Sequence, residues 1–133
     1  VEDGFRYVEL NLSPSGCWNA YDFTAYRSGM APRALARVPE ISLRTDDSDD
    51  HVLTFDAAVP RDALPALPCR LGLCAVLEEQ GGIKSYWALA HRSNDAPDFH
   101  AASGFTARVE PPSPHAGPRA TMSCHTPRDT TPP

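Results

Sequence analysis

The chain has 133 residues, a net charge of −5 and an apolar share of 41%. These values suit a single domain around one hydrophobic core. Nucleic-acid-binding proteins usually carry a cluster of lysines and arginines, whereas this chain has one lysine and scattered arginines, so we expect no nucleic-acid partner. No run of about 18 apolar residues is present, so we also expect no membrane span.

The first predicted unit is a β-hairpin. Apolar and polar residues alternate from Phe5 to Leu12, which is typical of a strand. Ser13-Pro14-Ser15-Gly16 then favours a type I turn or a close variant, and strand-forming residues resume up to Tyr26. On the return strand the expected core face is Cys17, Tyr21, Phe23 and Ala25, and the opposite face is Trp18, Asp22, Thr24 and Tyr26.

Short strands and turns continue along the chain. After a proline-containing connection at 30–38 we expect strands at 40–45 and 51–59, separated by an acidic turn at 46–50. Residues 60–68 form a loop with one helical turn at 61–64. Strands follow at 70–78, apolar on both faces, and at 84–90 after Gln80-Gly81-Gly82, with a last strand at 105–109. About seven strands without an amphipathic helix predict an all-β fold, an antiparallel β-sandwich with immunoglobulin-like layers.

The C-terminal segment differs from the rest in composition. Residues 110–133 hold half of the 14 prolines and no phenylalanine, tyrosine or tryptophan. Such a segment buries too little apolar surface to offset its ordering entropy. We therefore predict a sandwich domain at 1–109 and a disordered, proline-rich tail at 110–133.

The four cysteines indicate a compartment. Cys69 and Cys74 fall on one predicted strand, about 16 Å apart and on opposite faces, so they cannot bridge each other. We therefore expect free, mostly buried thiols, which together with the lack of a signal-peptide pattern favour a reducing, cytoplasmic location. The chain begins at Val1 and enters strand-like sequence almost at once, so we expect an N-terminally truncated or processed form.

Three segments together resemble a known family. They are Tyr7-Val8-Glu9-Leu10-Asn11-Leu12-Ser13-Pro14-Ser15-Gly16, Tyr26-Arg27-Ser28-Gly29-Met30, and Ser85-Tyr86-Trp87-Ala88-Leu89-Ala90-His91 followed by Pro97-Asp98-Phe99-His100. Residues 5–109 thereby resemble bacterial DOMON-like proteins, whose sandwich is similar to that of carbohydrate-binding modules of family 9. The resemblance implies a ligand site on a concave face or rim, and related domains bind sugars or haem. The family has further strands before the hairpin, and a site built partly from them would be incomplete here.

The residues by themselves offer candidates for a sugar site but do not favour one. A sugar site needs an aromatic surface for the ring and planar polar groups around it. Six of the 11 aromatic residues lie between Phe5 and Tyr26, and the expected faces of the two hairpin strands coincide. The predicted ligand-binding residues are Tyr7, Glu9, Asn11, Trp18, Asp22, Tyr26, Arg27 and Trp87. The plainer interpretation, which the residue pattern favours, is that Trp18 and Trp87 are core or sheet-packing residues and the polar groups line a solvated face.

Catalysis is not expected. Glu9 and Asp22 are paired carboxylates, but glycoside hydrolysis needs one of them held neutral across a deep cleft, which a short hairpin does not form. No nucleophile–histidine–acid order, phosphate loop or zinc-protease pattern is present. We therefore predict that the chain is not an enzyme.

We predict no metal site and no cofactor. The acidic turn at 46–50 offers calcium-type oxygens but lacks the glycine and glutamate of an EF-hand, so a solvated turn is favoured. His91, Asp98 and His100 could hold a transition metal, although we favour hydrogen bonds to the loop that ends the sheet. Met30 and His91 are a poor pair for haem.

Two functions from different classes remain open. The first is non-catalytic binding of a small polar ligand, most simply a carbohydrate. The second is a protein-interaction module that pairs with another chain through an exposed sheet edge. Exposed and adjacent Trp18 and Trp87 favour the first, and buried tryptophans favour the second.

Overall fold

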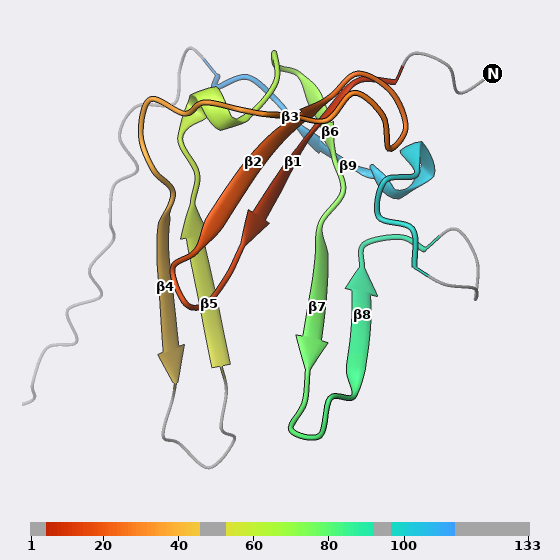
Figure 1. Cartoon of the computed structure of the whole chain (residues 1–133). Helices are drawn as coiled ribbons and strands as arrows, with labels where there is room; N and C mark the ends of the chain where they lie inside the picture. Colours follow the sequence, from red (N-terminus) through yellow and green to blue (C-terminus); the bar gives the residue numbers. More distant parts are fainter. Residues whose placement is uncertain (1–4, 46–52, 92–96, 114–133) are drawn as a thin grey trace, which may run out of the picture.

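The computed structural model describes residues 5–45, 53–91 and 97–113, and in these ranges the chain is all-β (Figure 1). Two single turns of 3-10 helix, η1 (Arg61–Ala63) and η2 (Ala102–Gly104), are the helical segments there, and neither is long and apolar enough to cross a membrane. The strands are β1 (Tyr7–Leu12), β2 (Trp18–Phe23), β3 (Ala31–Pro32), β4 (Glu40–Thr45), β5 (Leu53–Ala58), β6 (Cys69–Leu71), β7 (Cys74–Glu78), β8 (Lys84–Ala88) and β9 (Ala107–Val109).

The strands form four small sheets, ordered β1-β2-β3, β4-β5, β6-β9 and β7-β8, and every pairing is antiparallel. The predicted all-β, antiparallel class is thereby confirmed, as is the helical turn in the 60–68 loop. The face-to-face packing of these sheets as sandwich layers stays a prediction. The acidic turn at 46–50 and the tail beyond Ser113 lie outside the described residues, and 110–113 are exposed without regular structure.

The predicted strand at 70–78 is wrong as a single element. It is two strands, because β6 pairs with β9 whereas β7 pairs with β8. The change of partner falls at Gly72, where an added Cβ would lie 3.2 Å from the Gly104 carbonyl oxygen. Glycine suits this position, because an added Cβ would press on the Gly104 backbone. The prediction of free thiols is confirmed for Cys17, Cys69 and Cys74, and the last two lie in different sheets. The expectation that the thiols are mostly buried is wrong, because Cys17 and Cys74 are exposed and Cys69 is half-buried.

The loop of the first hairpin has three residues, 14–16, which is one more than the two-residue loop of a simple four-residue turn. The Gly16 N–H donates to the Ser13 carbonyl at 2.9 Å, as in that turn, but the strands close through the Ser13 N–H and the Cys17 carbonyl, also at 2.9 Å. Gly16 takes a φ of 84°, the left-handed value of the bulge residue in three-residue hairpin loops.

This extra residue decides which side chains share a face. Tyr7 lies opposite Phe23 and Leu12 lies opposite Trp18, whereas closure at Gly16 would have shifted the partner strand by one residue. A shift of one residue turns every side chain to the other face of a sheet. The expected coincidence of the Tyr7 face with the Trp18 and Asp22 face is therefore wrong.

The aromatic part of the core lies against the Tyr7 face of this hairpin. The rings of Tyr7 and Phe23 are buried and stack with centroids 4.6 Å apart and planes 6° apart. Phe105 packs edge-on against Phe5 at 5.1 Å, and the His100 ring stands edge-on to Phe23 at 5.5 Å. Residues 97–105 therefore cover one face of β1–β2, and the buried area of such aromatic rings dominates the packing energy of a small domain.

Two hairpins have exposed apolar faces instead. Leu43, Leu53 and Phe55 lie on one face of β4–β5 and are all exposed. In β7–β8, Leu73, Leu77, Trp87 and Leu89 share a face and are each more than half exposed, and Val76 and Tyr86 on the other face are also exposed.

Candidate functional site

A tight turn after β2 presents two of the predicted ligand residues, Tyr26 and Arg27. The Ala25 and Ser28 backbones bond each other on either side of it, with N–H to carbonyl distances of 3.4 and 3.1 Å. Arg27 has a φ of 49°, in the left-handed region that costs a residue with a side chain about 1–2 kcal/mol. Backbone strain of this kind is concentrated at functional sites.

Gly29 fixes the shape of the same turn. Its φ is 65°, and an added Cβ would lie 1.9 Å from the Thr24 Oγ1 atom. Both the backbone conformation and the space therefore require glycine at this position. Gly29 belongs to the segment that carried the family resemblance, and its role here is to bring Tyr26 and Arg27 out of the strand direction.

Asp98 holds this turn from the far side of the sequence. One carboxylate oxygen accepts the Tyr26 hydroxyl at 2.6 Å, and the other accepts the Arg27 Nη2 at 3.2 Å and the His100 backbone N–H at 3.2 Å. Partial burial raises the pKa of Asp98, but these hydrogen bonds and the Arg27 charge outweigh it, so the pKa lies below its ordinary value. The hydrogen bond to Asp98 likewise raises the pKa of Arg27.

His100 connects the same segment to β1. Its Nδ1 lies 2.8 Å from the Tyr7 hydroxyl, which also accepts the Arg27 backbone N–H at 3.2 Å. The Glu9 Oε2 atom lies 3.6 Å from the same Nδ1. Burial raises the pKa of Tyr7, so its hydroxyl stays protonated. The prediction that His91, Asp98 and His100 hydrogen-bond their loop is confirmed for Asp98, whereas the His100 side chain bonds Tyr7 on β1 instead.

These side chains come from β1, from the turn after β2 and from the 97–100 segment. We call them the polar cluster and define it as Tyr7, Glu9, Tyr26, Arg27, Asp98 and His100. It unites four of the eight predicted ligand residues. Asn11 lies beside it, because its amide donates to the Glu9 Oε1 atom at 2.6 Å. Tyr7 contributes only its hydroxyl, since its ring is core. Tyr26 is 42% exposed and the Arg27 side chain 54%, and the guanidinium lies 5.7 Å from the Tyr26 ring centre.

The remaining predicted residues lie elsewhere. Asp22 points to the opposite face of the hairpin and accepts the Arg33 Nη1 at 2.6 Å. Arg33 also bonds the Asp62 and Leu64 carbonyls, so Asp22 helps to tie β2 to the η1 loop. Trp18 is half-buried on that face. Trp87 is 61% exposed on β8, in a different sheet, and no ring contact joins the two tryptophans in the described chain.

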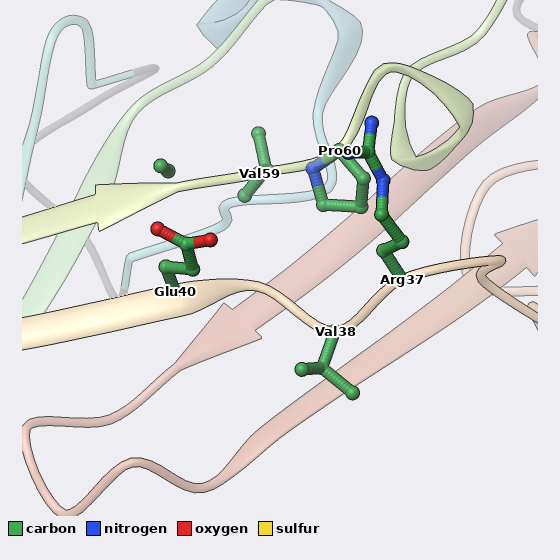
Figure 2. Close-up of a pocket in the computed structure, with 6 residues that line it drawn as sticks. Arg37, Val38, Glu40, Val59 and Pro60 are labelled. Carbon is green, nitrogen blue, oxygen red and sulfur yellow. The ribbon is translucent and has the colours of Figure 1, made fainter.

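A shallow hollow of about 190 Å³ lies apart from the polar cluster. Figure 2 shows its lining, with Arg37, Val38 and Glu40 on the chain that enters β4 and Val59 and Pro60 on the chain that leaves β5. None of these was a predicted ligand residue, and the hollow is open to solvent.

Sequence reasoning placed Asp98 and His100 in a loop and not in the ligand site. The signal that could have found them is the segment Pro97–His100, which formed part of the family resemblance together with Tyr26 and Arg27. Comparison with known proteins adds nothing to this, since no family model, no curated protein and no solved structure matches the chain. The DOMON-like resemblance therefore stays a prediction.

Proposed function

We propose that the polar cluster binds a carbohydrate without transforming it. The observation that carries the proposal is the pairing of Tyr26 and Arg27, two exposed side chains held in place by Asp98 at 2.6 and 3.2 Å. A fixed aromatic ring beside planar polar groups is the usual composition of a sugar site. Arg27 uses one N–H in its bond to Asp98, and a guanidinium has five such donors, so others are available to hydroxyl groups.

The charge of the cluster sets a preference among sugars. Glu9 and Asp98 bring two negative charges, Arg27 brings one positive charge, and His100 is uncharged when it accepts the Tyr7 hydrogen. A neutral or amino sugar meets no repulsion from this excess of negative charge, whereas a uronic acid does. We therefore expect neutral and amino sugars to bind better than acidic ones.

The same geometry supports a non-catalytic role. Glu9 and Asp22, the pair of carboxylates considered for glycoside hydrolysis, point to opposite faces of β1–β2. Hydrolysis needs both carboxyl groups on one bound sugar, about 5–10 Å apart across the scissile bond.

Isothermal titration calorimetry with a panel of neutral, acidic and amino sugars tests the proposal. Arg27→Ala should weaken binding by about 1–3 kcal/mol, as expected for a central polar anchor. Arg44→Ala is the matched control, since Arg44 is an exposed arginine that pairs with Asp56 on a different sheet. The absence of binding across the panel, or equal loss in both variants, would contradict a sugar site at this cluster.

A second candidate function, the protein-interaction module, is favoured by a separate observation. The β7–β8 hairpin is a two-stranded sheet with apolar side chains exposed on both faces, and in the described chain its outer edges have no strand partner. Unpaired edges and apolar faces invite the addition of strands from another chain.

Sedimentation velocity over a wide range of protein concentration tests this candidate as self-association. Leu77→Lys, at the centre of the exposed face, should abolish any association of the wild-type chain, whereas Glu79→Lys in the adjoining turn should leave it intact. A wild-type protein that stays monomeric at every concentration would count against pairing between copies.

A further inference from the structure

The Nδ1 atom of His100 faces two oxygen atoms of opposite hydrogen-bonding character. The Tyr7 hydroxyl, 2.8 Å away, carries a hydrogen. The Glu9 carboxylate, with its Oε2 atom 3.6 Å away, only accepts hydrogen bonds when it is ionised. Asn11 donates to the other oxygen of Glu9, which leaves Oε2 as the one directed towards His100.

Counting hydrogens assigns the form of His100 at neutral pH. The Tyr7 oxygen accepts the Arg27 backbone N–H at 3.2 Å, and its own hydrogen has the His100 Nδ1 as its acceptor in the described chain. Nδ1 must then lack a hydrogen, so a neutral His100 carries its hydrogen on Nε2. In this form Glu9 faces a lone pair, and no hydrogen lies between the two groups.

Protonation reverses this arrangement. A proton on Nδ1 places two hydrogens between His100 and Tyr7, so the hydroxyl can no longer donate there. The same proton turns the contact with Glu9 into an ion pair with a hydrogen to share. His100 therefore has two states. When neutral it accepts the Tyr7 hydrogen; when protonated it donates to the Tyr7 oxygen at 2.8 Å and forms an ion pair with Glu9 at 3.6 Å.

We propose that His100 is a proton-operated switch: protonation reverses its hydrogen bond with Tyr7, pairs it with Glu9 and so changes the charge of the polar cluster. The surrounding groups are consistent with such a switch. Tyr7 and Glu9 face the ring from β1, the uncharged Phe23 ring packs against it from β2, Arg27 lies beyond the Tyr7 hydroxyl, and Asp98 bonds the His100 backbone. The two carboxylates outweigh the one guanidinium, so the surroundings tolerate a cationic imidazole.

The expected effect of the switch on ligand binding rests on the proposed function. In the protonated state Glu9 is neutralised, and a sugar loses a charged acceptor for its hydroxyls. We expect affinity for neutral sugars to fall as His100 takes up its proton. The exchange of hydrogen bonds itself needs no ligand, so it is tested on the free protein and stands or falls separately from the sugar site.

Imidazole ¹⁵N chemical shifts followed from about pH 4.5 to 8.5 test the switch. His100→Gln identifies the His100 signals among those of the five histidines. We expect the neutral wild-type ring to carry its hydrogen on Nε2, and Tyr7→Phe to move a large share of it to Nδ1, where Glu9 can accept it. A wild-type ring with the hydrogen on Nδ1 at high pH would overturn the proposal.

Glu9→Gln tests the acidic state and keeps the core intact. Without the carboxylate, the protonated ring loses its ion-pair partner, so the midpoint of the His100 titration should fall. Asp56→Asn, on the β4–β5 hairpin, is the control and should leave the midpoint in place. Equal midpoints for the wild type and Glu9→Gln would show that Glu9 is not the second partner.

Discussion

The loops of the β1–β2 and β7–β8 hairpins share one hydrogen-bond pattern, and the two hairpins differ in what covers them. In the first, Ser13 and Cys17 close the strands and Gly16 donates back to Ser13. In the second, the Glu79 N–H bonds the Ile83 carbonyl at 2.8 Å and the Gly82 N–H bonds the Glu79 carbonyl at 3.0 Å, which is the same pattern. Gly16 and Gly82 have nearly equal φ values of 84° and 82°.

Their surroundings are opposite. One face of β1–β2 is covered by the aromatic core and by the segment that holds Asp98 and His100, whereas β7–β8 exposes large apolar side chains on both faces. A loop can therefore form a hairpin from local sequence alone, but a site also needs packing that fixes its side chains. In the described chain the polar cluster is attached to the hairpin that is packed.

Substitutions of large apolar residues should give the largest difference in unfolding free energy between the two hairpins. Phe23→Ala should lower the free energy of unfolding by about 3–5 kcal/mol, because it removes a buried ring stacked on Tyr7. Leu77→Ala should change it by less than about 1 kcal/mol, since this side chain is 52% exposed. Urea denaturation of both variants measures the difference, and a comparable loss for Leu77→Ala would show that β7–β8 is covered in solution.

Glycine substitutions should give the next largest effects. Gly29→Ala combines a left-handed φ with overlap against Thr24 and should cost about 2–4 kcal/mol. Gly16→Ala is the matched control, because it has the same backbone strain with nothing within 4 Å of the added Cβ, and should cost about 1–2 kcal/mol.

Gly82→Ala sharpens the comparison between the hairpins. Its strain equals that of Gly16→Ala, and its added Cβ also meets nothing. If β7–β8 opens without unfolding the core, the strain is released locally and the global unfolding free energy should change by less than about 0.5 kcal/mol. Equal losses for Gly16→Ala and Gly82→Ala would place both hairpins in one cooperative unit.

A smaller, pH-dependent effect is expected at Asp98. Its pKa is lower in the folded chain than in the unfolded chain, so its stabilising contribution is complete above the unfolded value and is lost as pH falls through the folded value. Asp98→Asn should therefore melt below the wild type at pH 7, and the gap should narrow below about pH 4. Asp56→Asn, in an exposed pair, should show little of either effect. A gap for Asp98→Asn that does not change with pH would contradict the role of its charge.

The sequence was sufficient for most of the longer strands, but not for the short β3, the split between β6 and β7 or the register of the first hairpin. Alternation and turn residues predicted β1, β2, β4 and β5 to within a few residues, because these signals are local. The pairing of Tyr7 with Phe23 depends on one bulge residue, Gly16, and a type I turn closes a hairpin with or without it.

Four of the eight predicted ligand residues lie together in the polar cluster, and long-range packing determines which four. Tyr26 and Arg27 reach Glu9 through Asp98 and His100, which lie about 70 residues further along the chain. Nothing local to Asp22 or Trp18 signals that they face the other way. The split between β6 and β7 was missed for a related reason, since the close approach of Gly72 to Gly104 is also a long-range contact.

Amide ¹H–¹⁵N spectra recorded during titration with a neutral sugar test the central claim most directly, because they follow both hairpins at once. We predict saturable shifts at Tyr26, Arg27 and the 97–100 segment, with no change at Val76 or Leu77 in β7. Shifts concentrated around Trp87, or no shifts at millimolar sugar, would contradict a carbohydrate site at the polar cluster.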